Sequence, residues 1–401
     1  MVEAVISWEM KVIGKERAGY IVPRSVCEQI KPFLAMDVLA EASRLERGGA
    51  RVIHLELGQP DFETPEFIKE AAIKATRDGK TGYTPANGIL PLREAIAAYY
   101  DVRYNVRISP EQVLITQGTS PGLMMLLAAL CDKGETVITP DPAYACYDPA
   151  IRFAGAESIR AATTEEEGFQ LAPGRVRRVL KPNTRAILVN SPSNPGGTLI
   201  ARRELKELSE LGPMLLSDEI YHGLVYEGEA ASALEVTGDC CVADGFSKRY
   251  AMTGWRLGWI VAPEPLTPTL IRLQQNFFLC ANSIAQWAGI EAIKHGWPHV
   301  ERMAAEYDRR RIIMLEGLRK LGFRIQSSPA GAFYILADAR QISASSLDLA
   351  FDILRRAHVA ITPGVDFGAA TEGYLRFCYA NSVENIEEAL ARLGKYLESI
   401  K

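Results

Sequence analysis

The chain has 401 residues, a formal net charge of −4, and charged and hydrophobic fractions of 23% and 48%. Its length accommodates a large domain and a smaller one, and its composition is that of an ordinary globular protein. The slightly acidic charge argues against a nucleic-acid surface, and no apolar run approaches the ~20 residues that a membrane-spanning helix needs.

The first residues and the cysteines favour a cytoplasmic location. Residues 1–11 lack the basic-then-apolar order of a secretory signal. The seven cysteines are odd in number and follow no metal-ligand spacing: Cys27, Cys131, Cys146, Cys240, Cys241, Cys280 and Cys378. Most lie in apolar segments, where a thiol acts as a small hydrophobe. We therefore expect a reducing compartment, the cytoplasm, and no metal site.

The N-terminal part of the chain combines helices with glycine-rich turns. We expect a helix that ends at 48–49, a strand over 52–55, a helix that begins at 64–65 and ends at 79, and a helix over 91–100. Between the strand and the second helix, Gly58 opens a Gly-Gln-Pro-Asp-Phe turn where the backbone could approach a ligand. The residues alone fit a plain turn equally well. An exposed loop at 82–88 carries Tyr83.

From residue 112 onward, short apolar strands alternate with helices. The strands are expected at 113–116, 137–139, 186–189, 214–217, 241–243 and 259–261. This pattern predicts an α/β fold, with a parallel sheet covered by helices on both faces. In such sheets, ligands bind outside the carboxyl ends of the strands.

Polar or glycine-rich segments follow these strands, at 118–122, 141–144, 190–197, 218–221 and 245–258. In the first, we expect Ser120 to cap the next helix and Pro121 to be its first residue. The free N–H groups of that helix could bind an anion, although a plain helix cap also fits. One ligand that gathers all five segments explains them better than separate local features.

After residue 298 the regular alternation of short strands and helices ends, and a different arrangement of helices and strands begins. We expect helices over 298–321 and 347–357 and at the C-terminus, and strands at 323–325, 332–337, 359–363 and 374–379. Strands with helices on one side predict a smaller α+β domain. We therefore divide the chain into an N-terminal segment, 1–60, that contributes to the small domain, a large cofactor-binding domain, 61–297, and a small domain, 298–401.

Lys248 follows an apolar run, and Arg256 lies eight positions after it. Burial of a lysine lowers its pKa, and the neutral amine can form a Schiff base with an aldehyde. An arginine suits a phosphate dianion. Pyridoxal 5′-phosphate carries both an aldehyde and a phosphate. By itself, however, this spacing also fits a surface lysine and an unrelated arginine.

Two further charged residues end or interrupt apolar strands. Asp218 needs a cationic partner, and the ring nitrogen of pyridoxal phosphate would supply one. Arg376 would be costly to bury unless it meets a carboxylate, either of an amino-acid substrate or of an internal salt bridge. The remaining candidates are neutral: Tyr221 and Asn194 for the ring oxygen, Tyr144 for stacking on the ring, and Gly118, Thr119 and Ser120 for the phosphate.

These motifs together resemble a known family. The segment at 245–258 is similar, position by position, to the lysine signature of the class I/II pyridoxal-phosphate-dependent aminotransferases, which have the aspartate aminotransferase fold (fold type I). The Gly-Gln-Pro-Asp-Phe turn, Tyr83 with Gly88, Asn194-Pro195-Gly196, Asp218 with Tyr221, and a C-terminal arginine recur in the same order. The resemblance extends from about residue 52 to the end, and is strongest to the bacterial and archaeal branch that includes thermophilic aspartate aminotransferases.

The resemblance implies an α/β fold in which the sheet of the large domain is mixed, mostly parallel and covered by helices. It also implies an enzyme that transfers an amino group from an L-amino acid to a 2-oxo acid by a ping-pong mechanism through a Lys248 Schiff base. Lys248, Asp218 and Tyr221 would be catalytic. Tyr144 and Ile220 would sandwich the ring, and Arg376, Asn194 and the Gly58 backbone would bind the substrate carboxylate. Tyr83 would reach the phosphate of the neighbouring subunit, because active sites of the family are shared across a homodimer.

The chain departs from its relatives at two positions. Many relatives place a phosphate-binding serine where this chain has Gly245, and Ser247 is the candidate replacement. The thermophilic aspartate enzymes have a lysine after the Gly-Gly of the phosphate turn, where this chain reads Gly118-Thr119-Ser120, and the segment at 277–279 is apolar. We therefore expect a neutral aromatic or aliphatic amino donor.

Two other functions compete with transamination. A C–S lyase or synthase of the same fold would use the same cofactor, because fold and cofactor do not fix the reaction. A transcription regulator with an aminotransferase-like sensor domain would carry a DNA-binding domain first. The roughly fifty residues before the first matching strand are not notably basic, which argues against it.

Overall fold

The computed structural model describes residues 25–400, and the chain divides into two compact units, Met1–Pro32 and Phe33–Lys401. In the first unit, the described part contains helix α2 (Ser25–Glu28). The prediction for residues 1–11 and the first part of the predicted segment 1–60 lie outside the described residues. The fold and the site below belong to the second unit.

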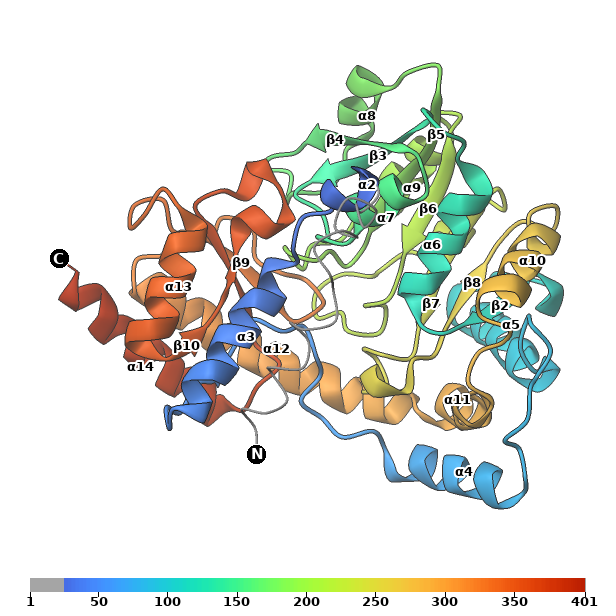
Figure 1. Cartoon of the computed structure of the whole chain (residues 1–401), viewed down its shortest axis with the longest axis horizontal. Helices are drawn as coiled ribbons and strands as arrows, with labels where there is room; N and C mark the ends of the chain where they lie inside the picture. The colour runs from blue at the N-terminus through green and yellow to red at the C-terminus, as the bar shows by residue number, and fades with distance from the viewer. Residues whose placement is uncertain (1–24, 401) are drawn as a thin grey trace, which may run out of the picture. The chain divides into compact units, whose positions relative to one another are not determined.

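A seven-stranded sheet forms the centre of the larger body (Figure 1). Its strands, in spatial order, are β2 (Val113–Thr116), β8 (Gly258–Val261), β7 (Cys240–Gly245), β6 (Met214–Asp218), β5 (Thr184–Asn190), β3 (Thr136–Asp141) and β4 (Glu157–Ala162). Strand β8 is antiparallel to both of its neighbours, β2 and β7, and the other neighbouring strands pair in parallel. The predicted mixed, mostly parallel sheet is confirmed. Strand β4 was missed because it lies at the edge, where its sequence is half polar.

Helices cover both faces of this sheet, because successive strand residues point to opposite sides. Ile187 and Val189 pack into one core, and Ala186 and Leu188 into another. The first core is closed by α4 (Glu66–Arg77), α5 (Leu90–Tyr104), α8 (Pro173–Val179), α9 (Arg202–Ser209) and α11 (Ser283–His295). The second is closed by α6 (Thr119–Leu130), α7 (Tyr147–Phe153) and α10 (Thr267–Phe277).

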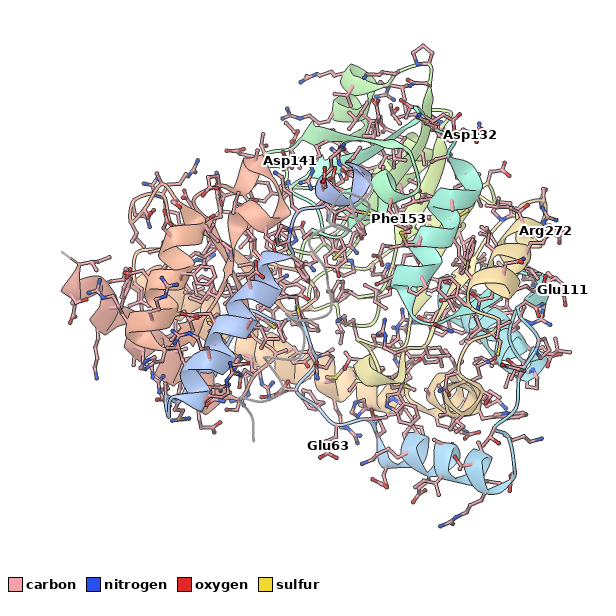
Figure 2. The ribbon with its side chains drawn as sticks, viewed as in Figure 1. Glu63, Glu111, Asp132, Asp141, Phe153 and Arg272 are labelled. Carbon is pink, nitrogen blue, oxygen red and sulfur yellow. The ribbon has the colours of Figure 1, made fainter. Side chains whose placement is uncertain are left out.

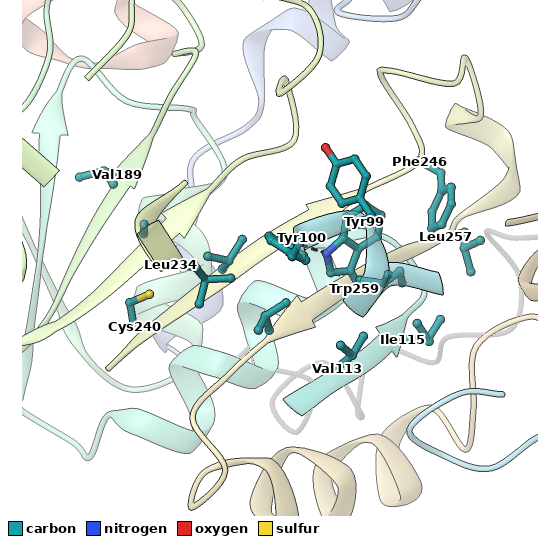
Figure 3. Close-up of a cluster of buried hydrophobic side chains, with 14 of the residues drawn as sticks. Tyr99, Tyr100, Val113, Ile115, Val189, Leu234, Cys240, Phe246, Leu257 and Trp259 are labelled. Carbon is teal, nitrogen blue, oxygen red and sulfur yellow. Dashed lines mark hydrogen bonds between the residues drawn. The ribbon is translucent and has the colours of Figure 1, made fainter. Parts of the chain in front are cut away.

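Aromatic residues of α5 fill the first core near β8. Figure 3 shows Tyr99 and Tyr100 against Trp259, whose Nε1 donates a hydrogen bond of 3.2 Å to the Tyr100 hydroxyl. Phe246, just after β7, packs edge-on against the same indole, with ring centres 5.1 Å apart. This packing fixes the backbone that leads to Lys248.

The smaller body has two short sheets and its own core. Strand β1 (Ile53–His54) pairs in parallel with β10 (Val359–Ala360), and β12 (Tyr374–Cys378) lies antiparallel between β9 (Tyr334–Asp338) and β11 (Thr362–Pro363). The helices are α3 (Leu34–Arg47), α12 (Trp297–Lys320), α13 (Ser346–Ala357) and α14 (Val383–Ser399). The pairing of β1 with β10 favours the grouping of residues 33–60 with the C-terminal part. The boundaries at 60 and 298 remain predictions.

Three local expectations were wrong. Helix α6 begins at Thr119 after Gly118, so Ser120 is not its cap, because Gly118 turns the chain at φ 94° before the helix. Helix α4 begins at Glu66, because the Thr64 hydroxyl donates to the Ala251 carbonyl instead of capping the helix. Residues 323–325 contribute one isolated bridge, between Arg324 and Asp338, rather than a strand.

Short 3₁₀ helices occur at η2 (Pro110–Gln112), η3 (Ala233–Glu235), η4 (Thr253–Trp255), η5 (Gly364–Phe367) and η6 (Ala369–Thr371). Charged side chains such as Glu111, Asp132 and Arg272 lie at the periphery (Figure 2).

Within residues 25–400, no helix is long and apolar enough to cross a bilayer. The same residues contain no group of three or more His, Cys, Asp or Glu side chains that could hold a metal ion.

Candidate active site

A cavity of about 270 Å³ lies where the polar strand ends meet. It gathers most of the residues predicted from the sequence: Gly58, Thr119, Ser120, Tyr144, Asn194, Asp218, Ile220, Tyr221, Ser247, Lys248, Arg256 and Arg376. Strands β5 and β6 bring Asn190 and Asp218 side by side in register, and the turn after β7 brings Lys248. One cavity therefore explains the set of strand-end motifs.

Lys248 lies three residues after the end of β7 and faces this cavity. Its Nζ donates a hydrogen bond of 2.6 Å to the Gly58 carbonyl. Among the described residues, no carboxylate lies within 4.0 Å of it. Burial lowers the pKa of the Lys248 ammonium to about 8, and the positive charges of Arg256 and Arg376 act in the same direction. A neutral amine, which is the nucleophilic form, is therefore accessible near neutral pH.

Asp218 is buried at the end of β6 and has no cationic partner within 4.0 Å among residues 25–400. The Tyr147 hydroxyl donates to its Oδ2 at 2.6 Å, and the Ile220 N–H donates to its Oδ1 at 3.2 Å. Burial raises the pKa of Asp218 to about 6, although these hydrogen bonds and the charge of Lys248 oppose the rise. A cationic ligand group would favour its ionised form.

The start of α6 and Arg256 form an anion-binding end of the cavity. The first turn of α6 has no side-chain cap, so its N–H groups are free. A Cβ at Gly118 would lie 2.5 Å from Arg256 Nη2, so only glycine leaves room for the guanidinium there. Free N–H groups, the helix dipole and an arginine together suit a phosphate dianion.

Arg376 is buried at 2% exposure in β12. Its Nη1 donates to Asn194 Oδ1 at 2.9 Å, and its Nη2 donates to Thr362 Oγ1 and to the Glu56 carbonyl. Its Nε has no hydrogen-bond partner, and no described carboxylate lies within 4.0 Å. The internal salt bridge considered from the sequence is therefore not formed within the described residues. The uncompensated guanidinium instead fits a ligand carboxylate.

Comparison with known proteins places the chain in a family. The family model described as aminotransferase class I and II matches residues 50–393. The chain belongs to the class I and II aminotransferases. It is 40% identical to the (5-formylfuran-3-yl)methyl phosphate transaminase of Methanocaldococcus jannaschii, over 91% of this chain and 96% of that protein.

A curated relative and a solved structure, both from Thermus thermophilus, extend this comparison. The chain is 38% identical to the aspartate/prephenate aminotransferase, over 92% of this chain and 97% of the relative. It is also similar to the structure of the aspartate aminotransferase with maleate, with a TM-score of 0.90, 37% identity, and coverage of 93% and 99% of the two chains. This chain is therefore an aminotransferase of the same α/β fold, while its relatives are named for different substrates.

The aminotransferase cavity also contains residues that the sequence did not single out. Tyr147 and Asn190 both bind Asp218, and the Tyr334 hydroxyl lies 2.8 Å from that of Tyr221. Asn190 begins the polar segment 190–197, so its position was a usable signal, whereas Tyr147 lies three residues beyond the segment 141–144. Tyr334 lies in an ordinary apolar strand, and Phe33 precedes a helix, so only the tertiary structure reveals these two.

Tyr83 and Gly245 lie apart from the other candidates. Tyr83 is 85% exposed and does not line the cavity, but it lines a neighbouring hollow of about 700 Å³ together with Arg256. Gly245 is buried against Gly258, and a Cβ there would lie 3.1 Å from the Gly258 Cα. Ser247 lines the cavity, so it is the serine available in this segment.

Proposed function

We propose that this aminotransferase binds pyridoxal 5′-phosphate and transfers an amino group from an L-amino acid to a 2-oxo acid by a ping-pong mechanism. One observation carries the proposal. Lys248, Arg256 and Arg376 surround one cavity without a described carboxylate partner, while the buried carboxylate of Asp218 in the same cavity lacks a cation. These unmatched charges fit a ligand with an aldehyde, a phosphate and a protonated ring nitrogen, and a substrate with a carboxylate.

The residues present fit this cofactor. Gly118, Thr119, Ser120, Ser247 and Arg256 would hold its phosphate, and Tyr144 and Ile220 would contact its ring faces. Asp218 would meet the ring nitrogen, with Tyr147 donating to its carboxylate and Asn190 donating to its backbone carbonyl. Asn194 and Tyr221 would donate to the ring oxygen, and Lys248 would hold the aldehyde.

When bound, pyridoxal phosphate supplies an electron-withdrawing ring that accepts the electron pair left when the substrate Cα loses its proton. Lys248 Nζ, with its lowered pKa, would take that proton and return it to the cofactor side. Arg376 and Asn194 would bind the substrate α-carboxylate and so orient the Cα–H bond, helped by the backbone at Gly58. Asp218 and Tyr221 are buried, so water has little access to their carboxylate and hydroxyl groups.

The C–S lyase or synthase weighed from the sequence would use the same residues, because fold and cofactor do not fix the reaction. The names of the relatives favour transamination. The two reactions differ in the fate of the amino nitrogen, because a transaminase passes it to a second oxo acid and an eliminating lyase releases ammonia.

We also propose a cytoplasmic homodimer with shared active sites. Large side chains near the hollow at Arg256 are exposed: Tyr83 at 85%, Phe277 at 71% and Leu279 at 56%. Exposed apolar side chains of this size favour a protein partner, and a second copy could bring its Tyr83 to this hollow. All seven cysteines are free thiols, which suits a reducing compartment.

The proposal is tested with an ¹⁵N-labelled amino acid and an unlabelled 2-oxo acid. The wild-type protein should move the label to the acceptor, whereas Lys248→Ala should not, because no other lysine of residues 25–400 lines the cavity. Lys294→Ala is the matched control, since this exposed lysine ends α11 away from the cavity. Label transfer by Lys248→Ala at the wild-type rate would remove Lys248 from the mechanism.

A further inference from the structure

Part of the cavity wall has no role in holding the cofactor or the substrate carboxylate. Phe33, Ala35 and Leu57 line it together with Gln59, and three of these four side chains are apolar. The Phe33 ring meets the Tyr144 ring edge-on, with centres 6.1 Å apart. Phe33 therefore packs against Tyr144, the residue that would contact the cofactor ring.

A carboxylate on another element fixes the position of Phe33. Asp366 accepts hydrogen bonds from the N–H groups of Leu34 at 3.0 Å and Ala35 at 3.2 Å, and so caps α3 in place of a local side chain. The next residue, Phe367, places its ring 4.8 Å from the Arg376 guanidinium carbon. Phe33 thus contacts the residue for the ring and lines the same cavity as Arg376, so it forms part of the wall that a substrate side chain would meet.

Among the described residues of the cavity wall, no basic side chain remains for a second substrate carboxylate. The basic residues that line the cavity are Lys248, Arg256 and Arg376, and each has a separate task in the proposed function. The other charged residues on its wall are acidic, Glu56 and Asp218. Glu56 Oε1 binds His54 Nδ1 at 2.8 Å, while its Oε2 is buried without a hydrogen-bond partner in the described part of the chain. A second carboxylate would therefore meet apolar surface and negative charge.

We infer that Phe33 is a specificity-determining residue, and that with Tyr144 it forms a subsite for uncharged, apolar substrate side chains and rejects a second carboxylate. This inference rests on the proposed function for the identity of the carboxylate and ring ends. The favoured substrates are then amino acids with aliphatic or aromatic side chains, and aspartate and glutamate are poor donors.

The test compares unreactive ligands as well as donors, using the protein loaded with pyridoxal phosphate. Calorimetry gives the dissociation constants of 3-phenylpropanoate and butanedioate, which lack the amino group of phenylalanine and aspartate. Wild type should bind 3-phenylpropanoate at least about tenfold more tightly, and show the same preference in kcat/KM for phenylalanine over aspartate. Phe33→Ala should lose about tenfold of this preference, and Phe33→Arg should reverse it by supplying a cation.

Phe153→Ala is the matched control, because Phe153 is a half-exposed phenylalanine at the end of α7, outside the cavity wall (Figure 2). It should keep the wild-type preference. Equal or tighter binding of butanedioate by wild type would overturn the inference, as would an unchanged preference in Phe33→Ala. If no donor transfers its amino group, the proposed function fails, and the calorimetric preference still decides whether this subsite exists.

Discussion

Lys248 combines a partly buried position with a titratable amine. Burial lowers the pKa of its ammonium from 10.5 to about 8, so the amine is mostly protonated at pH 7 and mostly neutral at pH 9. Because the neutral amine attacks an aldehyde, the rate at which the apoprotein takes up pyridoxal phosphate should rise with pH through about 8 and then level off. Stopped-flow absorbance measures this rate. A midpoint near the ordinary lysine value would show that Lys248 is not desolvated.

Arg376 is expected to act on substrate binding and not on the cofactor. Its guanidinium is held by Asn194 and Thr362, with no described carboxylate beside it. Arg376→Met should raise the KM for the amino donor about a hundredfold, since a buried charge pair with the substrate is lost. The dissociation constant of pyridoxal phosphate should stay near the wild-type value. An unchanged KM for every donor would make Arg376 a structural residue.

Residues with a chemical motif were predictable, and residues that act through packing were not. The charge of Lys248, Asp218 and Arg376 beside apolar strands was visible in the sequence, because a buried charge needs an explanation. Phe33 and Tyr334 carry no such signal, since aromatic residues are common in helices and strands. Their positions at the cavity depend on Asp366 and Tyr221, which are far away in the sequence.

At the scale of elements, the turn from β2 into α6 connects backbone geometry with anion binding. Gly118 has φ 94°, and a Cβ there would lie 2.5 Å from Arg256 Nη2. Gly118→Ala should therefore displace Arg256 and weaken pyridoxal phosphate binding at least about tenfold. Binding of pyridoxal, which lacks the phosphate, should change little.

Gly134→Ala separates this effect from backbone strain. Gly134 has φ 86°, but a Cβ there would have no neighbour within 4 Å. Both variants should lose about 1–3 kcal/mol of unfolding free energy in urea, because alanine is strained at positive φ. Only Gly118→Ala should lose cofactor affinity. Equal affinity in the two variants would mean that the contact with Arg256 does not matter for the phosphate.

The order of strands and helices was predictable, while their exact ends and the edge strand were not. Buried parallel strands are short apolar runs, and the six expected from the sequence are all present in the sheet. Strand β4 has an exposed, partly polar pattern, which is how an edge strand differs from a central one. The start of α6 was misplaced because Gly118, rather than a capping side chain, determines it.

For the whole molecule, a shared active site can be tested by mixing two inactive variants. If Tyr83 of one subunit serves the phosphate in the other, a Tyr83→Ala chain and a Lys248→Ala chain together form one intact site per heterodimer. After joint unfolding and refolding of equal amounts, about a quarter of the wild-type sites should be active. Light scattering should give the mass of a dimer. No gain of activity in a mixture that contains heterodimers would mean that Tyr83 acts within its own subunit.

The most direct test of the account is a single turnover with one amino donor and no oxo acid. The protein loaded with pyridoxal phosphate is mixed with an excess of phenylalanine, and the oxo acid and free ammonia are both measured. The account predicts one equivalent of phenylpyruvate per subunit, no free ammonia, and a single change in the visible absorption of the bound cofactor, since the nitrogen stays on the protein until an oxo acid arrives. Continued release of ammonia without an acceptor would contradict transamination and identify a lyase.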